Sequence, residues 1–320
     1  MEMETYENML LGMLSEKNII HRNGVIKPLS GGMSGAALYD IIHSGEGLVV
    51  KNYNVKRMSE APFDIKQGEK EYAFYSISSG IDAPYLPEVV YMGEDNNFGK
   101  VIVIKKYKAM SPVEWSHERL LAATDIYAHI SGCGDMYINA LGIKKEPYCA
   151  VSEKVLDESM NLWAAVLDKH DIEKCTLGEI RKDYHRYERF LYERSNFFNH
   201  GDVGPSNFVT DGDGSLVCID WQNPGFGGRA DLSHFFYMCR ISGIKADETA
   251  LMEYFCEMFT RYSGIETTLH ELNREFYAST LTVQFRHSAY YNRDAGRERV
   301  KSDYDAMLKA YEWLNADNTA

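Results

Sequence analysis

The most constraining feature of this sequence is a short loop and hairpin, set within a long stretch of helical character. Residues 200–207 include two glycines and a proline, and this combination excludes a helix and requires a shaped loop. The turn Asp211-Gly212-Asp213-Gly214 then predicts a tight hairpin, with strands at 207–210 and 216–221. A loop anchored in this way holds its side chains at fixed positions.

The hairpin predicts which polar side chains come together. If residues 211–214 form the turn, Thr210 pairs with Ser215, and Asn207 and Asp220 both lie towards the open end of the hairpin. Asp202 precedes that end and reaches the same place. Oxygen-donor side chains suit Mg²⁺, which binds one or two carboxylates together with phosphate oxygens and water. The spacing therefore predicts a magnesium site of the kind that phosphoryl transfer needs.

The rest of the chain divides into a strand-rich first third and a helical remainder. Its 320 residues exceed what one hydrophobic core usually organises, so we expect two lobes. The expected elements of the first third are three antiparallel strands within 25–53, with turns at 30–35 and 43–47, a helix at 65–79, and strands at 89–92 and 101–107. The expected helices of the remainder are 113–131, 152–169, 177–198 and three more between residues 247 and 315. An apolar stripe predicts the buried face of helix 177–198, and it consists of Leu177, Ile180, Tyr184, Tyr187 and Leu191.

Composition narrows the class of partner and the compartment. Lys and Arg number 34 against 47 Asp and Glu, and the formal charge of -13 argues against nucleic acid or an anionic membrane as the main partner. A cationic or neutral ligand is easier to accommodate. The six cysteines lie too far apart for a close-spaced zinc site, which predicts free thiols in a reducing cytoplasm. The N-terminus does not resemble a signal peptide and no run of about 18 apolar residues occurs, so we expect a cytoplasmic protein without a membrane span.

The spacing of the polar residues resembles that of a known family. His200-Gly201-Asp202, Asn207 five residues later, and Ile219-Asp220-Trp221 after the hairpin are similar to the catalytic signature of aminoglycoside phosphotransferases and choline kinases. The resemblance implies that Asp202 orients the acceptor hydroxyl and that Asn207 and Asp220 hold Mg²⁺. It also implies that Asp231, in the segment after the metal aspartate, braces the catalytic loop.

The resemblance extends to the first third of the chain. Residues 29–35 look like the nucleotide-covering loop of these kinases, in which glycines let backbone amides approach phosphate. Lys51 occupies the strand of the phosphate-binding lysine, and Glu71 resembles its ion-pair partner, with Glu69 as the alternative. The strand end at 105–107 would be the hinge, whose backbone should meet the adenine. The residues that the resemblance places around the nucleotide are Gly31, Gly32, Ser34, Gly35, Lys51, Glu71 and Lys106.

The implied fold is α+β and protein-kinase-like, with two lobes. Residues 1–107 would form a nucleotide-binding lobe around an antiparallel sheet, and residues 108–320 a mainly helical lobe with the catalytic loop and the acceptor site. The implied activity is transfer of the γ-phosphate of ATP or GTP, with Mg²⁺, to a hydroxyl of a small molecule such as an aminoglycoside, choline or a similar amino alcohol or sugar. The acceptor remains open, as does the choice between monomer and homodimer. The alternatives are a catalytically silent nucleotide-binding protein on this fold and a protein kinase, against which the missing Asp-Phe-Gly and Ala-Pro-Glu elements count.

Four features have competing interpretations. Residues 211–215 start like a calcium loop, but the sixth and twelfth positions lack the required Gly and Glu, which favours a hairpin turn. Residues 32–36 narrowly resemble a serine hydrolase elbow, although their flanks predict strand to strand. We interpret His200 as a residue that braces the loop through backbone hydrogen bonds and not as a general base. Tyr290-Tyr291 suit a cage for a quaternary amine, and core packing or surface placement explains them equally well.

Overall fold

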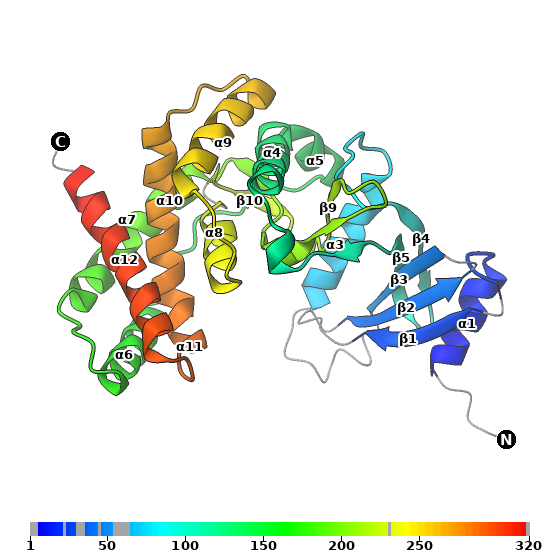
Figure 1. Ribbon diagram of the computed structural model, residues 1–320, viewed down its shortest axis with the longest axis horizontal. Coiled ribbons are helices and arrows are strands. Elements are labelled where there is room, and N and C mark those ends of the chain that lie inside the picture. The colour runs from blue at the N-terminus through cyan, green and yellow to red at the C-terminus, as the bar shows by residue number, and fades with distance from the viewer. Residues whose placement is uncertain are drawn as a thin grey trace. The chain divides into compact units, whose positions relative to one another are not determined.

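A computed structural model describes residues 6–21, 24–29, 36–43, 46–53, 65–229 and 232–317 (Figure 1). The chain divides into two compact units, of which one comprises Met1–Ala123 with His200–Pro224 and the other Thr124–Asn199 with Gly225–Ala320. The lobe boundary expected at residue 107 stays a prediction. The two compact units differ from the two expected lobes, because the segment His200–Pro224 packs with the N-terminal part of the chain. All residues of the expected catalytic cluster therefore belong to one unit.

The first unit contains a five-stranded antiparallel sheet in the order β1-β2-β3-β5-β4. Its strands are β1 (Val25–Leu29), β2 (Ala37–His43), β3 (Glu46–Tyr53), β4 (Val89–Asp95) and β5 (Gly99–Lys105). The antiparallel sheet expected in the N-terminal part of the chain is confirmed. β4 is longer than expected, and β5 begins and ends two residues early, because the turn after Asp95 is tight and the Asn97 amide donates to the Asp95 carboxylate at 2.7 Å.

The two faces of this sheet have different partners. Helix α1 (Tyr6–Glu16) covers one face, where Leu10 and Leu14 share a buried cluster with Tyr39, Val50 and Val103. Because side chains alternate along a strand, the residues next to these point to the other face. That face carries Lys51, which contacts helix α3 (Ile65–Ser78) through an ion pair. One face of the sheet therefore packs against α1, and the other face carries Lys51.

The hairpin that follows the loop 200–207 lies in a three-stranded sheet of the first unit. Strand β8 (Phe208–Thr210) pairs with β9 (Leu216–Cys218) and with the short strand β6 (Lys108–Ala109). The expected hairpin is confirmed, but the expected register is wrong by one residue, since Thr210 lies opposite Leu216. The loop is shorter than we expected because Asp211 pairs with Ser215 and Gly214 takes a positive φ of 91°, the geometry of a turn with a glycine bulge.

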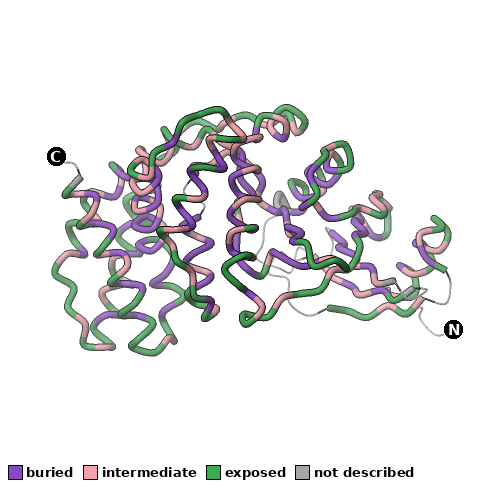
Figure 2. Tube along the Cα trace, turned by 45° about the horizontal axis from the view of Figure 1, so that its top comes forward, coloured by how far each residue is buried: buried purple, intermediate pink, exposed green. Residues whose placement is uncertain are grey.

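Helices make up nearly all of the second unit, as expected for the C-terminal part, and buried and exposed positions alternate along them (Figure 2). The helices are α4 (His117–Gly132), which begins in the first unit, α5 (Gly134–Leu141), α6 (Glu153–Lys169), α7 (Leu177–Arg194), α8 (Leu232–Ile241), α9 (Glu248–Ser263), α10 (Leu269–Val283), α11 (Ala289–Tyr291) and α12 (Arg297–Asp317). The expected stripe of α7 is buried at Leu177, Ile180, Tyr184 and Tyr187 and joins the core with α6, α10 and α12. Helices α5 and α8 were not expected.

The helix expected at 177–198 is shorter than we expected. α7 ends at Arg194, and Phe197–Asn199 forms strand β7, which pairs antiparallel with β10 (Gly225–Gly227). The apolar pair Phe197-Phe198 matches a helical continuation as well as a short strand, so periodicity does not separate the two. Pairing with a segment 26 or more residues later decides between them.

Two further expectations concern the chain as a whole. All six cysteines lie in the described part and are free thiols, as expected. Within the described ranges, no helix is long and apolar enough to cross a membrane.

Candidate active site

The site is built around a buried lysine. Lys51 lies near the middle of β3, and its side chain is 7% exposed. Its Nζ donates to Glu71 Oε1 of α3 at 2.6 Å and to Asp220 Oδ1 at 2.5 Å. Burial alone would lower the pKa of Lys51, but the charges and hydrogen bonds of the two carboxylates outweigh it and raise the pKa. The ammonium therefore stays charged and joins two distant segments of the unit.

The partner of Lys51 is Glu71 and not Glu69. The Glu71 carboxylate is fully buried, and the hydroxyl of Tyr53 donates to its second oxygen. Glu69 lies two residues earlier, is 59% exposed and sits 3.7 Å from Lys100. The sequence did not point to Tyr53, although its place two residues after Lys51 on a strand puts both side chains on one face. The buried group is therefore a lysine, a glutamate and a tyrosine acting together.

Asp220 sits at the end of the hairpin in an unusual backbone conformation. Its φ of 70° lies in the left-handed region, which costs energy for a residue other than glycine and clusters at functional sites. Gln222 Nε2 donates to Asp220 Oδ1 at 2.6 Å, and this contact was not expected from the sequence. The neighbouring Trp221 is fully buried, donates to the Cys218 carbonyl and stacks on Phe74 of α3 at 4.0 Å. The strained residue is thus held by an anchored neighbour.

The loop 200–207 is braced by His200, as expected. Its Nε2 lies 2.9 Å from the Ile219 carbonyl oxygen, and the Asp202 amide donates to its Nδ1 at 3.3 Å. This pattern assigns the proton to Nε2 of a neutral ring. Burial lowers the pKa of His200, which agrees with that assignment. His200 therefore fixes the loop to the hairpin and has no nitrogen left for acid-base work.

The loop positions Asp202 and Asn207 next to each other. Gly201 has a φ of 81°, and a Cβ at this position would lie 2.1 Å from the Asn223 carbonyl oxygen, so only glycine fits before Asp202. The Asn207 side-chain amide donates to the Asp202 backbone oxygen at 2.7 Å, and the Ile219 amide donates to the Asn207 backbone oxygen at 2.8 Å. The amide nitrogen of Asn207 is thereby engaged, and its Oδ1 is the group left for a ligand.

The donor set fits Mg²⁺ bound together with a phosphate group. Asp220, whose side chain is 29% exposed, supplies carboxylate oxygens, and Asn207, whose backbone oxygen accepts from the amide of Ile219, the residue before Asp220, supplies an amide oxygen. In the part of the chain that the structure describes, no group of three or more His, Cys, Asp and Glu residues could hold a metal by itself. Mg²⁺ commonly takes one or two protein ligands and completes its shell with phosphate and water. The residues present match that mode and not a closed protein cage.

Some expected site residues lie outside the described residues. These are Gly31, Gly32, Ser34 and Gly35 of the glycine loop and the bracing candidate Asp231. Lys106 is described, and its amide donates to the Gly47 carbonyl oxygen at 2.9 Å. A backbone contact of Lys106 with a base would therefore use its carbonyl oxygen. Its side chain lies 2.6 Å from Asp40, a residue that the sequence did not single out.

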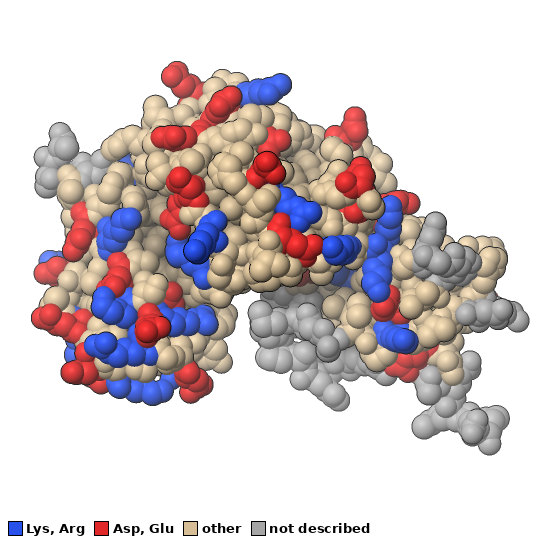
Figure 3. All heavy atoms as spheres, viewed as in Figure 1, with Lys and Arg blue, Asp and Glu red and all other residues tan. Residues whose placement is uncertain are grey.

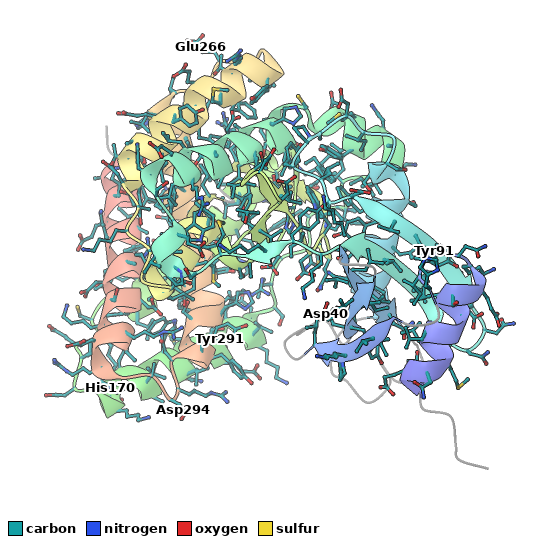
Figure 4. All side chains as sticks on the ribbon, turned by 45° about the vertical axis from the view of Figure 1, so that its right-hand side comes forward. Asp40, Tyr91, His170, Glu266, Tyr291 and Asp294 are labelled. Carbon is teal, nitrogen blue, oxygen red and sulfur yellow. The ribbon has the colours of Figure 1, made fainter. Side chains whose placement is uncertain are left out.

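Tyr290 and Tyr291 lie on the surface of the protein. Their rings meet edge to face at 5.6 Å and are 59% and 60% exposed, and Tyr291, the last residue of α11, is labelled in Figure 4. The guanidinium of Arg293 lies 4.6 Å from the centre of the Tyr290 ring and takes the place that a ligand cation would need. The surface interpretation of the pair is therefore correct.

Surface charge is drawn for one face of the molecule. On the face in Figure 3, Lys and Arg are interspersed with Asp and Glu over the described residues. No broad basic area is visible on that face, whereas a nucleic-acid interface clusters its Lys and Arg.

Solved structures share this architecture along nearly the whole chain. A spectinomycin phosphotransferase in complex with ADP and spectinomycin matches with a TM-score of 0.61 at 12% identity, over 96% of this chain and 95% of its own. A choline kinase from Cryptosporidium parvum Iowa II matches with a TM-score of 0.61 at 12% identity, over 97% and 96%. An aminoglycoside 2'-phosphotransferase variant in complex with GDP matches with a TM-score of 0.51 at 14% identity, over 98% and 97%.

The chain has the fold of the small-molecule kinases. No family model matches the sequence, and no curated protein does. The matches to solved structures confirm the fold expected from the resemblance of residues 200–202, Asn207 and residues 219–221. Both neighbours with the highest of these scores are phosphotransferases that act on small molecules.

We expect the brace at His200 to make stability depend on pH. Burial lowers the pKa of His200 in the folded protein. As the pH falls, His200 therefore becomes protonated more readily in the unfolded chain than in the folded protein, and this favours unfolding. The stabilisation is therefore complete above the ordinary histidine pKa of about 6.5 and is lost as the pH falls below it. Urea unfolding between pH 7.5 and 5.5 should show His200→Gln losing less stability than the wild type, by on the order of 1 kcal/mol. His117→Gln, at an exposed position, is the control, and equal pH slopes in all three proteins would contradict the expectation.

Proposed function

We propose that this protein is a phosphotransferase that moves the γ-phosphate of a nucleoside triphosphate to a hydroxyl group of a small molecule, with Mg²⁺. The observation that carries the proposal is the Lys51 ammonium, held between Glu71 and Asp220 in the unit that also contains the loop 200–207. A buried lysine paired in this way is preorganised to bind phosphate. The same unit supplies oxygen ligands and a further carboxylate.

Each residue of the cluster has a separate task in this proposal. Lys51 binds phosphate oxygens, and Glu71 fixes the direction of its side chain. Asn207 Oδ1 and Asp220 hold Mg²⁺, which neutralises negative charge on the phosphates when it is bound. The phosphates would then take over Lys51 contacts that Asp220 now makes, which frees carboxylate oxygen for the metal. The cluster is therefore arranged to bind a charged triphosphate.

Asp202 is the group that meets the acceptor. Its backbone is fixed through His200 and Asn207, so its carboxylate is presented from a rigid loop. A carboxylate in that position orients the acceptor hydroxyl and accepts its proton as the oxygen attacks phosphorus. Phosphoryl transfer needs little further covalent chemistry from the protein, because positioning and charge stabilisation dominate.

The class of acceptor is a hydroxylated small molecule, and a cationic one is favoured. Solved structures with this fold include kinases of spectinomycin and choline, and nucleotide complexes with ADP and with GDP. The formal charge of -13 favours a cationic acceptor and disfavours nucleic acid. Beyond Asp202, we expect the residues that recognise the acceptor within 108–320, because Lys51, Asn207 and Asp220 are assigned to the nucleotide and the metal.

A screen of acceptors tests this proposal directly. Purified protein with Mg²⁺ and ATP or GTP should consume nucleotide when amino alcohols, aminoglycosides or sugars are added. Each active compound should be compared with a matched analogue that lacks the hydroxyl, which should give no turnover. Nucleotide binding without turnover across the whole panel would instead favour the silent nucleotide-binding protein. Labelling of a protein and of no small molecule would favour a protein kinase.

A further inference from the structure

The Lys51 face of the sheet carries a second ion pair. Lys106 follows β5, and its Nζ lies 2.6 Å from Asp40 Oδ2 of β2 (Figure 4 marks Asp40). Asp40 lies opposite Val49 in the ladder, and the Lys106 amide bonds to Gly47. Val49 and Gly47 lie two and four residues before Lys51 on the same strand. Asp40 and Lys106, which lie opposite them, therefore point to the same face of the sheet as Lys51. The pair therefore belongs to the face that the proposed function gives to the nucleotide.

Around this pair the described face carries exposed apolar side chains, together with Lys27 of β1, which lies opposite Asp40. On this face Leu29 is 39% exposed and Ile42 is 48% exposed, and Val49 is only partly buried. On the opposite face, under α1, Tyr39 is 3% exposed and Val50 is fully buried. An apolar surface next to an ion pair suits a flat ring with polar atoms on its edge. A nucleobase has that chemistry.

The distance along the sheet also fits a base. Lys51 lies opposite Ile102 of β5, and Lys106 follows four residues later. At the usual rise per residue this is roughly 13 Å along the strand. That length is comparable with the span of a nucleotide from its phosphates to its base. When Lys51 binds the phosphates, the side chain of Lys106 is thus placed at the level of the base.

We propose that Lys106, held in place by Asp40, reads the edge of the nucleobase and favours guanine over adenine. This rests on the proposed nucleotide-binding function of the same face. A lysine ammonium carries three N–H donors, and Asp40 takes one of them. Guanine offers two adjacent acceptors, O6 and N7, whereas adenine has an amino group beside N7. A fixed ammonium therefore matches guanine and meets an unfavourable donor on adenine.

Asp40 acts as a positioning residue for this lysine. Its Oδ2 accepts from Lys106, while its Oδ1 is buried and accepts no hydrogen bond from the described residues. The carboxylate is thus devoted to one partner. Gly47 leaves the room for that partner, because a Cβ there would lie 2.7 Å from Lys106 Cδ. The direction of the lysine side chain is set from two sides.

Binding of GDP and ADP to the purified protein, measured by calorimetry, tests the proposal without knowledge of the acceptor. The wild type should bind GDP more tightly than ADP. Lys106→Met should weaken GDP binding by roughly tenfold and ADP binding much less, the order expected for one contact to a base edge. Asp40→Asn and Gly47→Ala should move the ratio of the two affinities in the same direction. Lys105→Met is the matched control, because this neighbouring exposed side chain points to the other face of the strand.

The outcomes separate this inference from the proposed function. If the wild type binds both nucleotides and the affinity ratio is the same in Lys106→Met, base reading by Lys106 is wrong while the proposed function stands. The same conclusion follows if Lys105→Met changes the ratio as much as Lys106→Met does. If the wild type binds neither nucleotide, both proposals fail. Thermal melting of each variant shows whether it is folded. The three substitutions, at Asp40, Gly47 and Lys106, each test the change in the ratio of the GDP and ADP affinities.

Discussion

Replacing Asp202 with alanine should reduce phosphotransfer by on the order of 10³-fold while nucleotide binding stays close to that of the wild type. Asp202 is proposed to accept the proton of the acceptor hydroxyl, and the groups assigned to phosphate and metal are other residues. Its backbone contacts with His200 and Asn207 do not involve the carboxylate, so the loop should keep its shape. Turnover with an acceptor from the screen and the affinity for nucleotide are the two measurements.

The controls for Asp202 separate chemistry from structure. Asp202→Asn keeps the size of the side chain but cannot accept the proton, so it should be as inactive as the alanine variant. Asp82→Ala removes an exposed carboxylate elsewhere in the same unit and should leave turnover unchanged. Full turnover in Asp202→Ala would show that the roles within the cluster are wrongly assigned, whatever the fold.

Lys51→Met should abolish activity and also destabilise the protein strongly. The substitution leaves the carboxylate of Glu71 fully buried without its cation, and among the described residues Tyr53 remains to donate to it. Removal of one partner of a buried ion pair typically costs about 3–5 kcal/mol, because the remaining charge is uncompensated. Urea unfolding should show a decrease of that order in the free energy of unfolding, and phosphotransfer should be lost.

A double variant separates the two effects of Lys51. Lys51→Met combined with Glu71→Gln removes both charges and should recover most of the lost stability, with activity still absent. Lys100→Met breaks a surface pair with Glu69 at 3.7 Å, and its stability should not change measurably. Recovery of activity in the double variant would rule out phosphate binding by Lys51. If the single variant Lys51→Met were as stable as the wild type, the buried Glu71 side chain would be protonated and uncharged in that variant.

Much of the site could be predicted because its chemistry is local in the sequence. Asp202, Asn207 and Asp220 lie within 19 residues, and two glycines, a proline and a tight turn fold that segment. Its turn residues predict the hairpin regardless of the rest of the chain. The one error there, a register shifted by one residue, came from the positive φ of Gly214. The turn residues predicted the hairpin, but they did not distinguish a four-residue loop from the shorter loop in which Asp211 pairs with Ser215.

Contacts between distant segments were harder to predict. The choice between Glu69 and Glu71 depends on the rotation of α3 about its axis, since residues two apart point to different sides of a helix. The ion pair of Lys51 with Asp220 spans 169 residues and the pair of Lys106 with Asp40 spans 66. Strand β7 exists because β10 pairs with it. None of these contacts leaves a periodic signal in one sequence.

The sequence by itself determined the antiparallel sheet, the helical remainder and the cluster of Asp202, Asn207 and Asp220. These follow from alternation, helical periodicity and turn chemistry, which act between residues close along the chain. Only the tertiary structure decided that Glu71 holds Lys51, that His200 is neutral and that Asp40 holds Lys106. The physical reason is that burial and ion pairing depend on which surfaces meet when the segments pack, and packing is set by the whole chain.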